Sequence, residues 1–200
     1  MKSFVEHSQV YRPYLYGLSV VFLGMIFYAA KTIFFIVSEK SIPWMDILTQ
    51  LIVWCFMLSI ILGRSCYELK DKEIVLTNKN PFRHRVVSVP YKAINGVHPF
   101  QVQLVKTVAY RYTFRMYANL DNRPIWSLIY NLPGEKKDRI ARVLMKASEP
   151  FWEAFEEKVP GKIRIPQEEA LHNTYRHMQK YYQKDELPKE IAPSEHFEKK

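Results

Sequence analysis

Two long apolar runs near the start of the chain limit what it can fold into. Residues 14–37 form a run of 24 with a single charge, Lys31, and residues 47–63 form a run of 17 with none. As helices they would extend about 36 Å and 25 Å, compared with about 30 Å of hydrocarbon in a bilayer. Trp44 and its neighbours extend the second run to about 20 residues. The runs predict two transmembrane helices, at about 14–37 and 44–63.

Two other interpretations of these runs stay open. A cleaved signal peptide would account for the first run, but its apolar part is long for one and Tyr28-Ala29-Ala30 is a poor cleavage site. Two buried helices of a soluble protein would also be apolar, although such helices usually keep a polar face. Because the link at residues 38–43 is short, the two helices are expected to form an antiparallel hairpin.

Positive charge is distributed unevenly around these helices. The link between them offers only Lys40, whereas residues 64–166 contain 19 Lys and Arg against 10 Asp and Glu. Cytoplasmic flanks of membrane helices carry the excess of Lys and Arg. The chain is therefore expected to span the cell (inner) membrane twice, with both termini in the cytoplasm.

The pattern after the apolar runs changes to alternation of polar and apolar residues. Such alternation is typical of half-buried strands, and the candidate strands are 66–70, 73–77, 83–89, 95–105, 108–118 and 123–132. Apolar residues then recur at spacings of three and four from Ile140 to Phe155. This spacing predicts an amphipathic helix of about 20 residues ending near Val159, with Pro150 as a kink or a split. The fold class is predicted as α+β, with a curled antiparallel sheet covered by a C-terminal helix.

Two segments of this region resemble bacterial pleckstrin-homology-like domains: residues 67–76 (YELKDKEIVL) and residues 85–97 (RVVSVPYKAINGV). The first has the Tyr-x-Leu-x-acidic pattern that leads into an apolar strand, and the second has the Pro-aromatic segment followed by spaced Ile and Val. The resemblance covers about residues 64–157, and many members of the family carry one or two membrane helices upstream. It implies a curled β-barrel with a C-terminal capping helix. It does not imply a defined activity, because that fold serves the recognition of lipid, peptide and protein alike.

The chain is thus expected to have three parts: a transmembrane hairpin at 1–63, a pleckstrin-homology-like cytoplasmic domain at 64–158, and a C-terminal part at 159–200. The last part is predicted to contain an amphipathic helix at 167–184 and a disordered tail. This helix either packs back on the domain, or docks on another subunit or on the membrane surface.

No motif of enzymatic chemistry stands out. The chain has neither a Gly-rich phosphate loop nor a metalloprotease or nucleophile-elbow motif, and Cys55 and Cys66 lack zinc-site spacing. We therefore expect no catalytic residues, no cofactor and no metal. Nucleic acid is not an expected partner either, because the positive charge is juxtamembrane and follows the topology.

One cluster of basic residues is a candidate binding site. If the first strand leaves the membrane after Arg64 and the next one returns, the loop after residue 78 lies near the lipid headgroups. The candidate headgroup-binding residues are Arg64, Lys79, Arg83, His84 and Arg85. Alternatively, these charges only keep a hairpin edge soluble and fix the topology.

The expected function is a non-catalytic, membrane-anchored module that recognises anionic lipid headgroups, docks a partner protein, or both. An accessory subunit of a larger membrane complex is the alternative, and a membrane-bound enzyme is the less favoured one.

Overall fold

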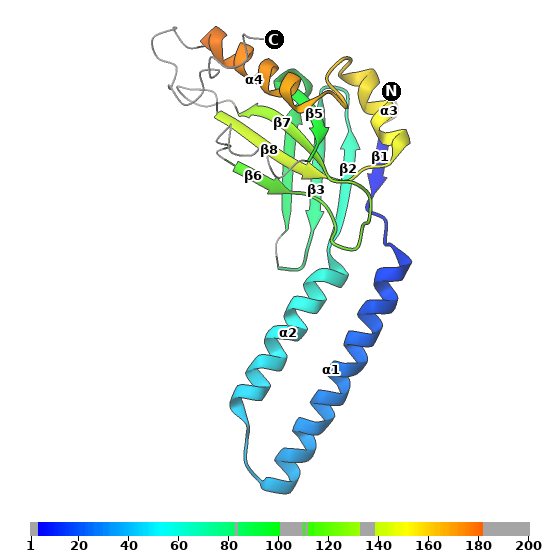
Figure 1. Ribbon diagram of the computed structural model, residues 1–200, viewed down its shortest axis with the longest axis vertical. Coiled ribbons are helices and arrows are strands. Elements are labelled where there is room, and N and C mark those ends of the chain that lie inside the picture. The colour runs from blue at the N-terminus through cyan, green and yellow to red at the C-terminus, as the bar shows by residue number, and fades with distance from the viewer. Residues whose placement is uncertain (1–3, 83, 101–109, 111, 133–138, 182–200) are drawn as a thin grey trace, which may run out of the picture.

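The computed structural model describes residues 4–82, 84–100, 110, 112–132 and 139–181 (Figure 1). A short strand, β1 (Phe4–His7), is followed by the long helices α1 (Arg12–Glu39) and α2 (Trp44–Leu62). The strands that follow are β2 (Arg64–Leu69), β3 (Glu73–Lys79), β4 (Arg85–Pro90), β5 (Ile94–Pro99), β6 (Tyr112–Arg115), β7 (Trp126–Leu132) and β8 (Arg139–Met145). A 3-10 turn, η1 (Tyr91–Ala93), precedes β5, and the helices α3 (Glu149–Lys158) and α4 (Gln167–Tyr181) end the described chain.

Helices α1 and α2 form a hairpin that projects away from the sheets (Figure 1). Their bounds confirm the two helices predicted at about 14–37 and 44–63. With 28 and 19 residues they extend about 42 Å and 28 Å. Both are long and apolar enough to cross a membrane, and only 6% of the most apolar stretch of each helix is buried within the structure. The hairpin is therefore not part of the core of the sheets.

The described strands form two four-stranded sheets. The first sheet has the order β1-β2-β3-β4, and all its neighbours are antiparallel. The second sheet has the order β5-β7-β8-β6, with β6 parallel to β8 and the other pairs antiparallel. The fold class is thus α+β, as predicted, with one mixed sheet.

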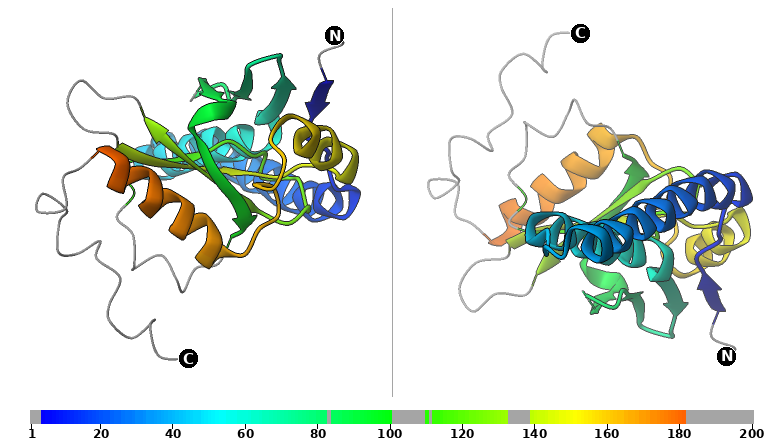
Figure 2. Two further views of the ribbon diagram at one scale, coloured as in Figure 1. Left: turned by 90° about the horizontal axis from the view of Figure 1, so that it is seen from above. Right: turned by 90° about the horizontal axis from the view of Figure 1, so that it is seen from below.

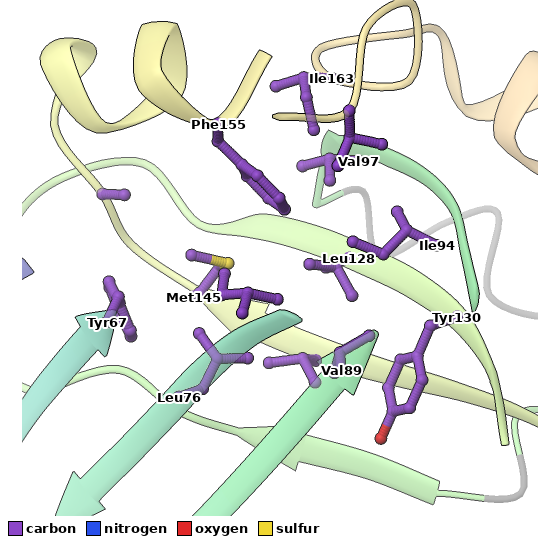
Figure 3. Packing of buried hydrophobic residues seen from close by; sticks show 14 of the residues in the cluster. Tyr67, Leu76, Val89, Ile94, Val97, Leu128, Tyr130, Met145, Phe155 and Ile163 are labelled. Atoms are coloured by element: carbon purple, nitrogen blue, oxygen red, sulfur yellow. The ribbon is translucent and has the colours of Figure 1, made fainter. Parts of the chain in front are cut away.

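The hydrophobic core lies between the two sheets (Figure 3). Tyr67, Leu76 and Val89 of the first sheet face Leu128 and Met145 of the second, and all five are fully buried. Helix α3 closes one end of this core with its aromatic residues Phe151, Trp152 and Phe155. The alternation of the first sheet follows from this arrangement, because one of its faces meets the core.

Helix α4 covers the other face of the second sheet, and the view from below shows α3 and α4 at opposite ends of the sheets (Figure 2). Ala170 of α4 is fully buried with Ile129 and Ile140 in a second apolar cluster. Gly96 of β5 allows this close approach, because a Cβ there would lie 2.8 Å from the Cβ of Ala170. The described part of α4 thus packs back on the domain, and residues 182–184 of the predicted helix lie outside the described residues.

The single long helix predicted from residues 140–155 is wrong. Residues 139–145 form strand β8, and the helix begins only at Glu149, next to Pro150. The cause is burial on both faces of β8: Ala141 and Val143 meet the core between the sheets, while Ile140 belongs to the second apolar cluster. A strand buried on both faces loses its alternation, so its apolar spacing resembles that of a helix.

The curled barrel is not found among the described strands. No backbone pairing joins the two sheets there, so they remain a two-layer arrangement with α3 at one end. Strand β1 was not predicted at all, because four residues ahead of an apolar run carry little signal. Residues 83, 101–109 and 111, which the predicted strands included, lie outside the described residues, as does the predicted tail at 185–200.

Candidate membrane-facing basic edge

The helical hairpin is inserted between two neighbouring strands of one sheet. Strand β1 precedes α1 and strand β2 follows α2, yet the two strands pair directly, with His7 opposite Cys66. The Tyr11 N–H, next to the start of α1, also donates to the Leu120 carbonyl at 2.8 Å. The start of α1 and the end of α2 are therefore held at the same side of the sheets. If the helices cross a membrane, the chain crosses twice and the sheets stay on one side.

The turn between β3 and β4 is fixed to the last turn of α2. The Asn80 side-chain amide donates to the Ser59 carbonyl at 3.0 Å and to the Ser59 hydroxyl at 2.9 Å. The side-chain oxygen of Asn80, Oδ1, accepts a hydrogen bond from the Phe82 N–H at 3.0 Å, which stabilises the turn. Phe82 is 61% exposed. The turn thus presents an uncovered aromatic ring beside the end of an apolar helix.

Four of the five predicted headgroup residues lie in the described chain, and the structure gathers them at this end of the first sheet. Arg64 stands opposite Lys79, and Arg85 stands opposite Asn78. Arg64, Lys79 and His84 are exposed, while Arg85 is half-buried. Arg83 lies outside the described residues. We call Arg64, Lys79, His84 and Arg85 the basic edge.

The basic edge carries no internal compensation of its charge. Within the described residues, none of its arginines or its lysine forms an ion pair with a carboxylate. The Arg85 guanidinium instead lies 5.0 Å from the centroid of the Phe114 ring, a cation–π distance. Among the described residues, no carboxylate thus neutralises the charge of the basic edge, which lies at the end of the first sheet next to α2. Figure 1 shows α2 leaving the sheets at this end.

A small cavity adjoins the basic edge, and it includes residues that were not predicted. Its volume is about 150 Å³, and Asn78, Arg85, Thr113 and Arg115 line it. The Asn78 side-chain amide donates to the Arg115 carbonyl at 3.3 Å, which links the two sheets there. The alternation in the sequence predicts that Thr113 and Arg115 share one polar face of a strand. It does not predict that they lie next to the β3–β4 hairpin, because this proximity depends on the packing of the two sheets.

A second polar cluster is buried and serves to attach β1. Glu6, 8% exposed, pairs with Arg123 and accepts hydrogen bonds from the Ser148 N–H at 2.8 Å and hydroxyl at 3.0 Å. Arg123 also pairs with Asp121 at 2.6 Å. Burial works against the charge of Arg123, but the hydrogen bonds to Asp121 and Glu6 raise its pKa overall. The cluster thus joins the strand before α1 to Ser148, the residue that precedes α3.

The described residues contain no group of three or more His, Cys, Asp or Glu side chains placed to hold a metal ion. Their most buried carboxylates, Glu6 and Asp121, are occupied by Arg123. The chemistry that the candidate site offers is therefore the binding of anions by guanidinium, ammonium and amide groups.

Comparison of the chain with protein-family models, with curated proteins and with solved structures finds no match. A function for the chain has to be argued from its own geometry. The relevant geometry is the hairpin inserted between β1 and β2, together with the basic edge beside the end of α2.

Proposed function

We propose that the chain is a membrane-anchored module whose basic edge binds anionic lipid headgroups at the cytoplasmic face of the cell membrane. The observation that carries the proposal is the contact of Asn80 with Ser59. It ties the turn of the β3–β4 hairpin to the level at which α2 ends. Where α2 leaves the hydrocarbon, this turn and its cations meet the headgroups.

The electrostatics support the proposal. An anionic leaflet attracts each Lys or Arg near its surface by about 1 kcal/mol, and this attraction fades over a screening length of about 8–10 Å. Lys79 stands opposite Arg64, only two residues beyond the end of α2, so both lie well within that distance. Phe82, exposed at the same turn, suits the interfacial region in which aromatic rings collect.

The orientation is inferred from the flanking charge. Lys40 is the only Lys or Arg in the link between the two helices, whereas Arg64 and Lys79 stand at the side of the sheets. The positive-inside rule then assigns the sheets and both termini to the cytoplasm.

We further propose that residues 64–158 form a pleckstrin-homology-like domain. The support is the meander β2-β3-β4, followed by a second sheet and by α3 over one end of the core. Domains of this kind bind ligands without catalysis, which agrees with a binding role for the basic edge.

One observation favours the alternative, an accessory subunit of a larger membrane complex. Helices α1 and α2 leave a cavity of about 250 Å³ between them, lined by Gly24, Tyr28, Gln50 and Trp54 among others. Gln50 also donates to the Thr32 hydroxyl at 2.6 Å, within this apolar hairpin. Side chains from a partner's helix would fill such a space. If it does, a second membrane protein should co-purify with the chain in mild detergent at fixed stoichiometry.

The proposed lipid binding can be tested on the full chain in a neutral detergent. Short-chain phosphatidylglycerol and phosphatidylcholine are added, and the bound lipid is counted by native mass spectrometry. We expect preferential binding of phosphatidylglycerol, weakened about 5- to 30-fold in the R64Q/K79Q variant.

The matched control is K70Q/K72Q, which removes the same charge from the β2–β3 turn, at the far end of the same strands. This variant should change the affinity by less than about twofold, because those lysines lie beyond the screening length from the headgroups. Equal losses in the two variants, or equal binding of the two lipids by the native chain, would refute the proposal.

A further inference from the structure

The cavity beside the basic edge has the composition of a phosphate site. Its four lining residues are Asn78 and Arg85 from the β3–β4 hairpin and Thr113 and Arg115 from β6. Two of these residues are arginines, two carry neutral hydrogen-bonding groups, and none is acidic. Guanidinium groups recognise phosphate oxygens through pairs of parallel N–H donors.

The two arginines are held in place by different means. The Arg85 guanidinium lies over the Phe114 ring at 5.0 Å, so its plane is supported without the use of its N–H groups. The Arg115 carbonyl accepts the Asn78 amide at 3.3 Å, which anchors the Arg115 backbone next to the hairpin. Among the described residues, neither arginine has a carboxylate partner. Their donors are therefore available to an anion.

Thr113 is set up as a donor. Arg142, its cross-strand neighbour on β8, donates from Nη2 to the Thr113 hydroxyl oxygen at 3.4 Å. The hydroxyl proton then points away from this contact and remains available to a ligand. The Arg142 guanidinium itself lies 4.6 Å from the centroid of the Tyr110 ring.

The size and position of the cavity restrict what it can hold. A volume of about 150 Å³ is below the about 300–1,000 Å³ of pockets that enclose drug-sized molecules, so it fits one small anionic group. Asn78 precedes Lys79, and Thr113 and Arg115 are exposed, so the cavity opens at the surface beside the basic edge.

We propose that this cavity binds a phosphomonoester dianion through Arg85 and Arg115, with Thr113 as a neutral donor. Two guanidinium groups match two negative charges, which a phosphomonoester carries near neutral pH and a phosphodiester does not. The inference rests on the proposed membrane role for its favoured source, a lipid headgroup with a terminal phosphate. Inorganic phosphate has the same chemistry and is the second source.

The test uses the full chain in neutral detergent with three short-chain lipids: phosphatidic acid, phosphatidylglycerol and phosphatidylcholine. Native mass spectrometry gives the bound fraction of each. A phosphomonoester can form charge-assisted hydrogen bonds that a phosphodiester cannot, so we expect phosphatidic acid to bind at least about tenfold more tightly than phosphatidylglycerol. In the R85Q/R115Q variant this preference should fall to about onefold to twofold.

The matched control is R64Q/K79Q, which removes two charges from the same edge but none from the cavity. It should weaken both anionic lipids and leave the preference for phosphatidic acid intact. The Thr113→Val variant keeps every charge and should lower the preference severalfold, which guards against a folding defect in the double arginine variant. Inorganic phosphate is added in a separate arm, and displacement of phosphatidic acid by it at submillimolar concentration would make free phosphate the source.

The two proposals fail in different ways. If the native chain binds phosphatidic acid and phosphatidylglycerol equally while still preferring both to phosphatidylcholine, and inorganic phosphate does not bind, the phosphate site is refuted and the proposed function stands. Loss of the preference in R64Q/K79Q to the same degree as in R85Q/R115Q also refutes the site. If the chain does not discriminate between anionic and neutral lipids, and inorganic phosphate does not bind, both proposals are refuted.

Discussion

Ser8 and Ser65 hydrogen-bond to each other from opposite ends of the helical hairpin. The Ser8 N–H donates to the Ser65 carbonyl at 2.8 Å, and the Ser65 N–H donates to the Ser8 hydroxyl at 3.1 Å. These bonds close the β1–β2 ladder on the side of the helices. The two long apolar helices are thus an insertion into an otherwise ordinary antiparallel strand pair. This relationship holds both helix ends on one side of the sheets.

The inserted hairpin should be replaceable by a tight turn. In a variant with residues 9–64 replaced by Asn-Gly, Ser8 and Ser65 would flank a two-residue turn of the type that connects antiparallel strands. We expect this variant to be soluble without detergent, to unfold cooperatively and to be monomeric by light scattering. A matched variant that starts at Ser65 lacks β1 and the Glu6 contacts, and it should unfold at a clearly lower temperature. If the Asn-Gly variant and the variant that starts at Ser65 both aggregate, the helical hairpin is not a separable insertion between β1 and β2.

The pairing of Glu6 with Arg123 should stabilise the fold. Glu6→Gln removes the charge that faces Arg123 and weakens the acceptor for Ser148. Because Arg123 keeps Asp121 as a partner, we expect a loss of about 1–3 kcal/mol in the free energy of unfolding, less than for a charge left fully unpaired. Denaturant titration measures it. The control Glu157→Gln, on the exposed side of α3, should change stability by less than about 0.5 kcal/mol.

A methyl group at Gly96 should displace α4. The added Cβ would lie 2.6 Å from the Ile165 Cδ1 and 3.2 Å from the Ala170 Cα, and the second contact can be relieved only by moving the helix backbone. We expect Gly96→Ala to cost about 1–3 kcal/mol and to speed tryptic cleavage within α4. Gly17→Ala is the control, because its Cβ meets nothing within 4 Å. Unchanged cleavage in Gly96→Ala would mean that α4 does not pack as described.

The predictable parts of this fold are those in which one local pattern dominates. Helices α1 and α2 are apolar on all sides, so their bounds follow from the sequence within a few residues. The hairpin β2–β3 follows from alternation on one buried face. The sequence pattern of strand β8 predicts a helix because the strand is buried on both faces. Strand β1 is not predicted because it has only four residues, which form a strand through their pairing with β2.

The candidate site divides in the same way. The cations at 64, 79 and 85 were predicted as one cluster, because a tight turn between β2 and β3 determines which residues stand opposite each other. Arg115 and Thr113 were not, because they reach the same cavity from the other sheet. Contacts between sheets depend on the packing of the whole core, which no local pattern encodes.

Stability should fall as the pH drops through the range in which histidine titrates. His98 is 2% exposed, its Nδ1 donates to the Pro99 carbonyl at 2.7 Å, and its Nε2 has no hydrogen-bond partner among the residues that the structure describes. Burial is the largest influence and lowers the pKa of His98. The hydrogen bond to Pro99 and the charge of Glu168 oppose this shift, and the charge of Arg142 adds to it, so that the pKa is lowered overall. In the unfolded state, His98 therefore takes up a proton near pH 6.5, whereas in the folded state it takes up this proton only at lower pH.

The free energy of unfolding of the native chain should accordingly decrease between about pH 7.5 and 5.5. In His98→Gln this histidine no longer contributes, so the decrease should be smaller although stability at pH 7.5 is also reduced. Denaturant titrations at the two pH values measure both slopes. Identical slopes in the native chain and the variant would show that His98 is not buried in its neutral form.

The depth of the β3–β4 turn tests the membrane role most directly. In a chain with Cys55 and Cys66 replaced by Ala, a spin label is placed by Phe82→Cys, or by Asp71→Cys at the opposite end of the strands, and the full chain is reconstituted in nanodiscs containing phosphatidylglycerol. Electron paramagnetic resonance then compares collision with oxygen, which concentrates in lipid, and with a water-soluble nickel chelate. We predict that the label at 82 is reached by oxygen and shielded from nickel, and that the label at 71 shows the reverse. Equal access of nickel to both labels would contradict contact between the basic edge and the bilayer.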